Sequence, residues 1–230
     1  MGIVANAAAI VLGGILGSLC RKKLIPQSFW MLGICVSIIS LVSFIENMFQ
    51  ITEHTFESSH LYTVILSLAV GYTVGELLGL NDRISNLSTA TNASLIGVTD
   101  TVVFFGIGGL QICGPIMLAL EHDSSQLYLK SLIDFPFAFL FGATYGKKIG
   151  ISAIPVALVQ LLITAVAFLA GDFISDAMIR QICSIGYVIL FFSGINMIPD
   201  IKYKIKTVNM LPAIPIVILI DLITSFFTIY

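Results

Sequence analysis

Ionisable side chains inside long apolar stretches are the residues of this sequence best placed to do chemistry. At membrane depth such groups cost several kcal/mol unless they are paired or hydrated, so each marks a candidate site. Lys130 and Asp134 are four residues apart, which predicts an ion pair on one helix face. Glu76 stands near the inner end of one apolar stretch, and Asp221 near the middle of another. Glu76 or Asp221 could carry a proton or a cation, and Lys130 with Asp134 could form an outer gate or coupling site. A cap at the interface explains Lys130 and Asp134 equally well, and a structural hydrogen bond explains Asp221 equally well.

Uncharged polar side chains interrupt the same stretches. They are Asn6, Gln111, Gln160, Thr164, Asn196 and Asn209. An amide can coordinate a cation through its oxygen or bind a carboxylate through its nitrogen, and it can also join helices at roughly 1 kcal/mol. The hypothesis for substrate binding takes Asn6, Gln160, Thr164, Asn196 and Asn209 as a converging pocket. The matching hypothesis for a gate or coupling site takes Lys130, Ser131, Asp134, Glu76 and Asp221.

The remaining reactive residue types do not form a catalytic or metal-binding pattern. The histidines His54, His60 and His122 all fall in polar gaps, away from any nucleophile in a span. The four cysteines are scattered singly through apolar stretches, so we expect small core residues, not a disulfide framework or a zinc site. We therefore predict neither an enzyme nor a metal or cofactor site. A basic patch with interleaved aromatic residues is missing, which argues against nucleic acid as a partner.

The elements that must position these residues are membrane-spanning helices. Hydrophobic residues make up 57% of the sequence, charged residues 10%, and the mean hydropathy is +1.02. So little polar surface cannot cover a soluble globule of this size. The sequence predicts an all-α, polytopic transmembrane helix bundle that forms a single integral membrane domain over residues 1–230, with lipid as its surroundings.

Eight apolar runs approach the roughly 20 residues that a helix needs to cross the hydrocarbon. They are about 3–20, 29–49, 61–80, 97–120, 131–147, 151–170, 181–199 and 208–230. Nine of the 11 Lys and Arg residues fall in alternate gaps between these runs. Because cytoplasmic loops collect basic residues, this alternation predicts a multi-pass protein of the bacterial inner membrane with both termini outside the cytoplasm. We expect the segment Asn81–Ser94 to be a polar cytoplasmic linker.

The fourth run is predicted to be a broken helix. Its helix breakers include Gly106, Gly108, Gly114 and Pro115. Irregular backbone at membrane depth is tolerated only where protein or water surrounds it, so this segment points to a cavity. The fifth run looks short, and Lys130 and Asp134 fall near its outer end.

Three odd-numbered runs carry glycines at intervals of four residues. The sets are Gly13 and Gly17; Gly71, Gly75 and Gly79; Gly142, Gly146 and Gly150. This spacing lines one helix face and lets backbones approach closely, within the chain or in a homodimer. The parallel direction of the three runs fits a four-plus-four duplication. The similarity of Val4-Ala5-Asn6 to Val208-Asn209 fits an inverted repeat instead, and the sequence leaves both open.

Several blocks extend this pattern from one end of the chain to the other. They include Asn6-Ala7-Ala8-Ala9-Ile10, Gly71-Tyr72-Thr73-Val74-Gly75-Glu76, Ser152-Ala153-Ile154-Pro155-Val156, Gly194-Ile195-Asn196 and Val208-Asn209-Met210-Leu211-Pro212-Ala213. The most specific block is Lys130-Ser131-x-x-Asp134, followed by Gln160 and Thr164. With these blocks the chain resembles the bacterial membrane family called domain of unknown function 554. It departs from that pattern at Gly106–Leu110 and at Leu161. The resemblance implies a membrane or transport protein and supplies no substrate.

Three functions are compatible with these residues. The first is a secondary transporter or permease for a small polar solute or ion, motivated by the broken fourth run and the distributed polar groups. The second is a passive channel lined by the glycine-rich fourth run. The third is a structural or regulatory membrane protein whose polar groups only hold helices together.

Overall fold

The computed structural model describes residues 1–20, 26–51, 56–58, 60–89, 96–106, 110–198 and 201–228. Six of its helical stretches are long and apolar enough to cross a bilayer. They lie in α1 (Gly2–Leu19), α2 (Pro26–Met48), α7 (Ser125–Tyr145), α8 (Ala153–Leu169) with η1 (Lys147–Ser152), α9 (Asp176–Ile195), and α10 (Ala213–Thr228) with η3 (Thr207–Met210). Two shorter apolar helices are α3 (Leu61–Leu77) and α6 (Leu110–Leu120). The predicted all-α membrane bundle is confirmed, and the count of eight spans stays a prediction.

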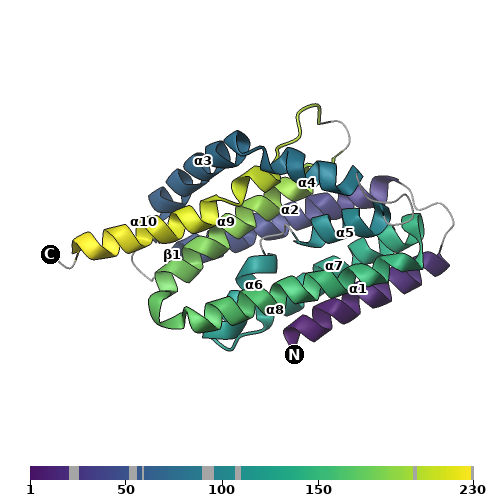
Figure 1. The fold of residues 1–230 in the computed structure, drawn as a ribbon, viewed down its shortest axis with the longest axis horizontal. Helices are drawn as coiled ribbons and strands as arrows, with labels where there is room; N and C mark the ends of the chain where they lie inside the picture. The colour runs from purple at the N-terminus through teal and green to yellow at the C-terminus, as the bar shows by residue number, and fades with distance from the viewer. Residues whose placement is uncertain are drawn as a thin grey trace.

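Three pairs of helices form the frame of the bundle (Figure 1). Along α1 and α7 the contacts run from Gly2 with Leu127 to Gly17 with Phe139, so these helices are parallel. Along α2 and α9 they run from Gly33 with Gly194 to Asn47 with Arg180, so these two are antiparallel. Helix α3 lies antiparallel to α10. These relative directions match those that the alternating charges predict for spans one and five, two and seven, and three and eight.

The glycine faces pack helices within the chain. Gly13 and Gly17 of α1 lie against the backbone of α7, while Gly142 of α7 lies against Gly14. On α3, Gly71 and Gly75 lie against Ala213 and Asn209. The three sets therefore do not share one partner. Gly13, Gly17, Gly71 and Gly75 pack helices within the protein, whereas a Cβ at Gly79 would have no neighbour within 4 Å, and a homodimer stays a prediction.

Gly17 is the position in this frame least able to accept a side chain. A Cβ atom there would overlap the carbonyl oxygen of Phe139 on α7, which is backbone and cannot rotate away. We expect Gly17→Ala to lower the free energy of unfolding by about 1–3 kcal/mol, as overpacking does in a dense core. Thermal unfolding in detergent measures this. The control is Gly150→Ala, whose new Cβ would lie 3.6 Å from its nearest neighbour; an equal loss for both variants would contradict the packing argument.

The fourth predicted span contains helix α5 (Ile96–Gly106) and helix α6, which begins at Leu110. The predicted break does not extend to Gly114 and Pro115, because both are buried inside α6. Residues 107–109, which include Gly108, lie outside the described residues, so a break there stays a prediction.

Two connecting segments differ from the sequence predictions. Residues 80–89 form the helix α4 (Leu80–Thr89), although we expected a linker from Asn81. Gly79 separates α3 from α4 with φ +61°, a left-handed conformation that glycine adopts without strain at a helix end. The predicted outer gap after α2 carries an antiparallel pair of short strands, β1 (Phe49–Ile51) and β2 (Phe56–Ser58), in which Gln50 pairs with Glu57. A short helix η2 (Gly171–Phe173) connects α8 to α9.

A polar network at the interrupted helix

Helix α7 places Lys130 and Asp134 in the interior of the bundle. It begins at Ser125, not near residue 131 as the sequence indicated. At 1.5 Å per residue, Lys130 and Asp134 therefore lie roughly 8 and 14 Å along the axis from the helix start. The hydroxyl and backbone N–H of Ser125 donate to Asp123 Oδ1 just before this start, and both bonds lower the pKa of the Asp123 carboxyl.

Lys130 and Asp134 form the predicted ion pair, and it is buried. Lys130 Nζ lies 2.8 Å from Asp134 Oδ2, and the two residues are 3% and 4% exposed. An interfacial cap, which we considered for this pair, is therefore wrong. Lys130 Nζ also donates to the carbonyl oxygen of Phe105 at 3.1 Å and lies 5.8 Å from the centre of the Phe105 ring.

The Phe105 carbonyl belongs to the last described turn of α5. The C-terminal end of a helix carries a partial negative charge, which a nearby cation stabilises. Lys130 therefore binds a backbone carbonyl in this turn. Sequence reasoning could not find this backbone ligand, since a carbonyl group has no residue-type signal.

Three amides extend the network from Asp134 across the bundle. Asn6 Nδ2 on α1 donates to Asp134 Oδ2 at 2.7 Å. Gln160 Nε2 on α8 donates to Asn6 Oδ1 at 3.1 Å and to Gln111 Oε1 at 3.0 Å. Gln111 Nε2, at the start of α6, donates to the carbonyl oxygen of Val156 at 3.0 Å. All three amide residues are fully buried.

A small cavity adjoins the ion pair. Its volume is about 30 Å³, and its lining includes Lys130, Asp134 and Phe104, together with Ser193 and Gly194 of α9. This exceeds the roughly 10–15 Å³ that a cavity needs to hold one water molecule. The network thus combines a charged pair, a helix end and a space for one small species.

The other predicted pocket residues have local partners. The hydroxyl groups of Ser131 and Thr164 donate to carbonyls one turn earlier in their own helices. Asn196 makes two hydrogen bonds with the backbone of Ile205. Asn209 Oδ1 accepts from the backbone N–H of Asn81 at 3.0 Å. The structure therefore brings Asn6 and Gln160 together with Lys130 and Asp134. The other four predicted residues bond to backbone groups instead: Ser131, Thr164, Asn196 and Asn209.

Asn209 is expected to contribute to stability by holding the start of α4. It is 1% exposed, and its oxygen satisfies a backbone donor in the first turn of that helix. We expect Asn209→Leu to lower the free energy of unfolding by about 1 kcal/mol, because the Asn81 N–H loses its acceptor. Thermal unfolding in detergent checks this. Thr73→Val is the control, since the exposed Thr73 hydroxyl bonds only to the carbonyl of Ala69 in its own helix; an equal loss there would contradict this role of Asn209.

Asp221 and Glu76 lie apart from the network. Asp221 is 8% exposed and accepts a hydrogen bond from Gln181 Nε2 of α9 at 2.8 Å. Gln181 was missed as a candidate, although a glutamine in an apolar run is the same signal that selected Gln160. Glu76 is exposed at the end of α3, where it raises the pKa of Lys206 less than the directly bonded Asp82 does.

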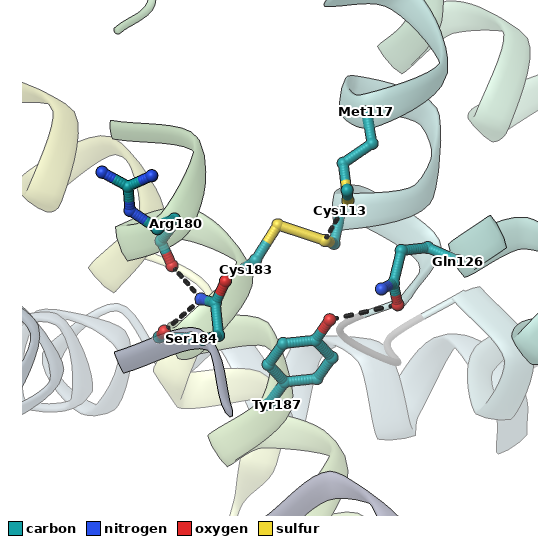
Figure 2. The surroundings of a disulfide bond; sticks show 8 residues. Cys113, Met117, Gln126, Arg180, Cys183, Ser184 and Tyr187 are labelled. Atoms are coloured by element: carbon teal, nitrogen blue, oxygen red, sulfur yellow. Dashed lines mark hydrogen bonds between the residues drawn. A yellow bond between two sulfur atoms is a disulfide. The ribbon is translucent and has the colours of Figure 1, made fainter. Parts of the chain in front are cut away.

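Two of the cysteines form a disulfide that we did not predict. Cys113 of α6 is bonded to Cys183 of α9, close to a hydrogen bond between Tyr187 and Gln126 (Figure 2). Cys20 and Cys35 are free and exposed. The expectation of four small core residues is therefore wrong, because two are bridged and two lie on the surface.

Comparisons with known proteins agree with the membrane fold. The chain is 27% identical over 226 residues to the uncharacterized membrane protein YdfK of Bacillus subtilis (strain 168), covering 95% of this chain and 96% of that protein. It is 26% identical over 227 residues to the uncharacterized protein YqgA of Escherichia coli (strain K12), covering 93% of each. No solved structure matches the chain. Residues 1–222 match the family described as protein of unknown function (DUF554), and the chain therefore belongs to this family of multi-pass membrane proteins.

Proposed function

We propose that this protein is a secondary transporter or permease that moves a small polar solute or ion across the bacterial inner membrane. The observation that carries the proposal is the buried Lys130–Asp134 pair, with Lys130 bound to the Phe105 carbonyl in the last described turn of α5, next to the predicted helix break. Interrupted helices whose ends meet charged groups near the bilayer midplane are a recurring way to build transport sites. Buried ionisable groups in a membrane helix are expensive and commonly serve transport.

The cavity favours a carrier over a passive channel. It holds about 30 Å³ next to Lys130 and Asp134, which is room for one small species. A conducting pore needs a continuous file of such spaces. Electrical recording separates the alternatives, because single-channel steps would support a pore, whereas slow saturable flux supports a carrier.

A structural role for the same groups makes a different prediction. Helix packing here is already provided by the glycine faces of α1, α3 and α7, which bring backbones into direct contact. The network is therefore not required merely to bring α1 and α7 together. If the structural alternative holds, apolar replacement of Gln160 or Asp134 lowers stability and leaves flux per folded molecule unchanged.

The proposed orientation has both termini outside the cytoplasm. It follows from the nine basic residues in alternate gaps, whose loops we assign to the cytoplasm. We expect a fusion of alkaline phosphatase after Tyr230 to be active, and a fusion of green fluorescent protein there to be dark. An inactive alkaline phosphatase fusion together with a fluorescent green fluorescent protein fusion would place the C-terminus in the cytoplasm and contradict this orientation.

Reconstitution tests the transport function. Purified protein in liposomes should give saturable flux of at least one member of a panel of alkali cations, amino acids and organic acids. Binding of the same compound should raise the thermal unfolding temperature in detergent. If protein-free liposomes match the proteoliposomes for every compound, and none shifts the unfolding temperature, the proposal fails.

A further inference from the structure

We propose that the transported species is a small monovalent cation exchanged for a proton, and that the Lys130 ammonium occupies the cation's place at Asp134 in this conformation. This inference rests on the transport function proposed above and names its substrate class. It follows from the ligands of the ammonium group, the orientation of the amide network, and the size and charge of the site.

The ligands of Lys130 are those that a hard monovalent cation uses. The ammonium lies 2.8 Å from Asp134 Oδ2 and 3.1 Å from the carbonyl oxygen of Phe105. Carboxylate and carbonyl oxygens are the ligands that hard cations prefer, and the partial negative charge of a helix C-terminus adds to their attraction. When Lys130 is neutral and withdrawn, the same two oxygens become available to an incoming ion.

The amide chain contains a surplus acceptor. Asp134 accepts a hydrogen bond from Asn6 Nδ2, so the Asn6 oxygen is the atom that faces Gln160. Gln160 therefore donates to it through Nε2. Both hydrogens of Gln160 Nε2 are then used, on Asn6 and on Gln111. Gln160 Oε1 is left buried without a hydrogen-bond partner among the described residues.

The orphaned oxygen shows that the amide chain is oriented by the ion pair. An unpartnered buried acceptor costs about 1–3 kcal/mol, and turning the Gln160 amide over would set its oxygen against those of Asn6 and Gln111. The polarity of the chain is thus fixed by the carboxylate of Asp134. Gln160 is not among the residues that line the cavity, so the amide chain is joined to the cavity through Asn6 and Asp134.

The size and charge of the site select a monovalent ion. The cavity of about 30 Å³ beside Lys130 and Asp134 has room for a water-sized species or a small ion. Asp134 is the single carboxylate among the described residues that line it, so one positive charge neutralises it. The part of the chain that the structure describes holds no group of three or more His, Cys, Asp or Glu residues able to hold a metal ion, which argues against a divalent ion here.

The exchange step balances in charge. The starting site contains the Lys130 ammonium and the Asp134 carboxylate. When a cation M⁺ binds to the carboxylate, the ammonium gives its proton to water on the side from which M⁺ came, and neutral Lys130 remains. After M⁺ leaves on the other side, Lys130 takes up a proton from that side. The site has no net charge before or after, so one cation moves for one proton without net current.

The surrounding helices add few other groups that titrate. Helices α1, α6 and α8, which border the network, carry no ionisable side chain. On the other elements packed against α7, Glu46 of α2 and Lys147 and Lys148 of η1 are exposed. The side chain of Asp100 on α5 is not among those that the structure describes. Arg180 and Tyr187 lie on α9, where Tyr187 bonds to Gln126 of α7.

Proteoliposomes that contain a pH-sensitive dye test this exchange. NaCl, LiCl or KCl is added outside, with choline chloride as the reference. We expect at least one alkali cation to make the lumen alkaline in a saturable way. Clamping the membrane voltage with valinomycin and equal K⁺ on both sides, during the Na⁺ or Li⁺ additions, should leave the rate of this pH change unchanged. Asp134→Asn should lower the rate at least tenfold. Lys130→Gln should lose the pH change while still taking up radiolabelled Na⁺, if Na⁺ is the active ion.

A control and the unmodified protein keep the outcomes distinct. Asp82→Asn, which removes an exposed carboxylate from α4, should retain the full exchange rate. If no alkali cation exceeds choline with the unmodified protein while an organic solute still shows saturable flux, the exchange inference is overturned and the transporter proposal stands. If no compound moves at all, both fail. Cation uptake at an undiminished rate in Asp134→Asn would also overturn the inference.

Discussion

Lys130→Met is expected to lower the free energy of unfolding by roughly 3–5 kcal/mol, because it leaves Asp134 buried without its counterion. Asp134 is 4% exposed, and Asn6 would remain its side-chain hydrogen-bond partner. The double variant Lys130→Met/Asp134→Leu removes both charges and should recover most of the loss. A double-mutant cycle, measured by thermal or denaturant unfolding in detergent, isolates the coupling between the two residues.

The protein contains a matched pair for comparison. Lys206 Nζ lies 3.0 Å from Asp82 Oδ1, but these side chains are 44% and 64% exposed. Exposed pairs contribute about 0–1 kcal/mol, so Lys206→Met should have little effect. If Lys130→Met and Lys206→Met lowered the free energy of unfolding by similar amounts, Lys130 would be hydrated in the folded protein. That result would contradict the buried charge on which the proposed site depends.

The general fold could be predicted because it depends on two signals that are local in sequence. Apolar length locates the helices, and the alternation of basic gaps sets their directions, which the parallel packing of α1 on α7 matches. The start of α7 was missed because Gln126, Lys130 and Asp134 lower the apolarity of its first turns. Those side chains bind inside the bundle, and hydropathy does not distinguish a polar residue facing protein from one facing water.

Helix α4 was missed although its sequence contains a helical pattern. Leu80, Ile84 and Leu87 are spaced by four and three residues, the period of one helix face. The polar residues between them suggested a linker. The pattern was the better guide, because an amphipathic helix at an interface is mostly polar by composition.

The candidate site was predictable in its residue types but not in its connections. Asn6, Lys130, Asp134 and Gln160 were selected because polar groups in apolar runs are costly, and they meet in one network. Asn196 and Asn209 gave the same signal, yet they bind backbone groups at loops and helix ends. Which amide finds a side chain and which finds a backbone group depends on tertiary packing that spacing in sequence does not encode.

Removing the disulfide with Cys113→Ala/Cys183→Ala is expected to lower the free energy of unfolding by about 2–4 kcal/mol. The bond joins residues 70 positions apart, so it restricts a large part of the unfolded chain. Alanine avoids leaving a buried hydroxyl without a partner. Thermal unfolding with and without a membrane-permeant reductant measures the effect. Reduction should bring the unmodified protein close to the double variant and leave the variant unchanged.

The two free cysteines provide the control for the disulfide variant. Cys20→Ala/Cys35→Ala removes two exposed, free thiols and should change stability by less than about 0.5 kcal/mol. If a thiol reagent labels four cysteines per chain after denaturation without reductant, the bond is absent and the prediction fails.

Helix α6 is held on two sides. Gln111 and Cys113 are two residues apart, so at 100° per residue their side chains project from nearly opposite faces of α6. The amide bonds hold that half-helix to α8 and the disulfide holds it to α9, whereas α5 is attached to the site through Lys130. Helix α5 also packs against α7 through the rings of Phe104, Phe137 and Phe141.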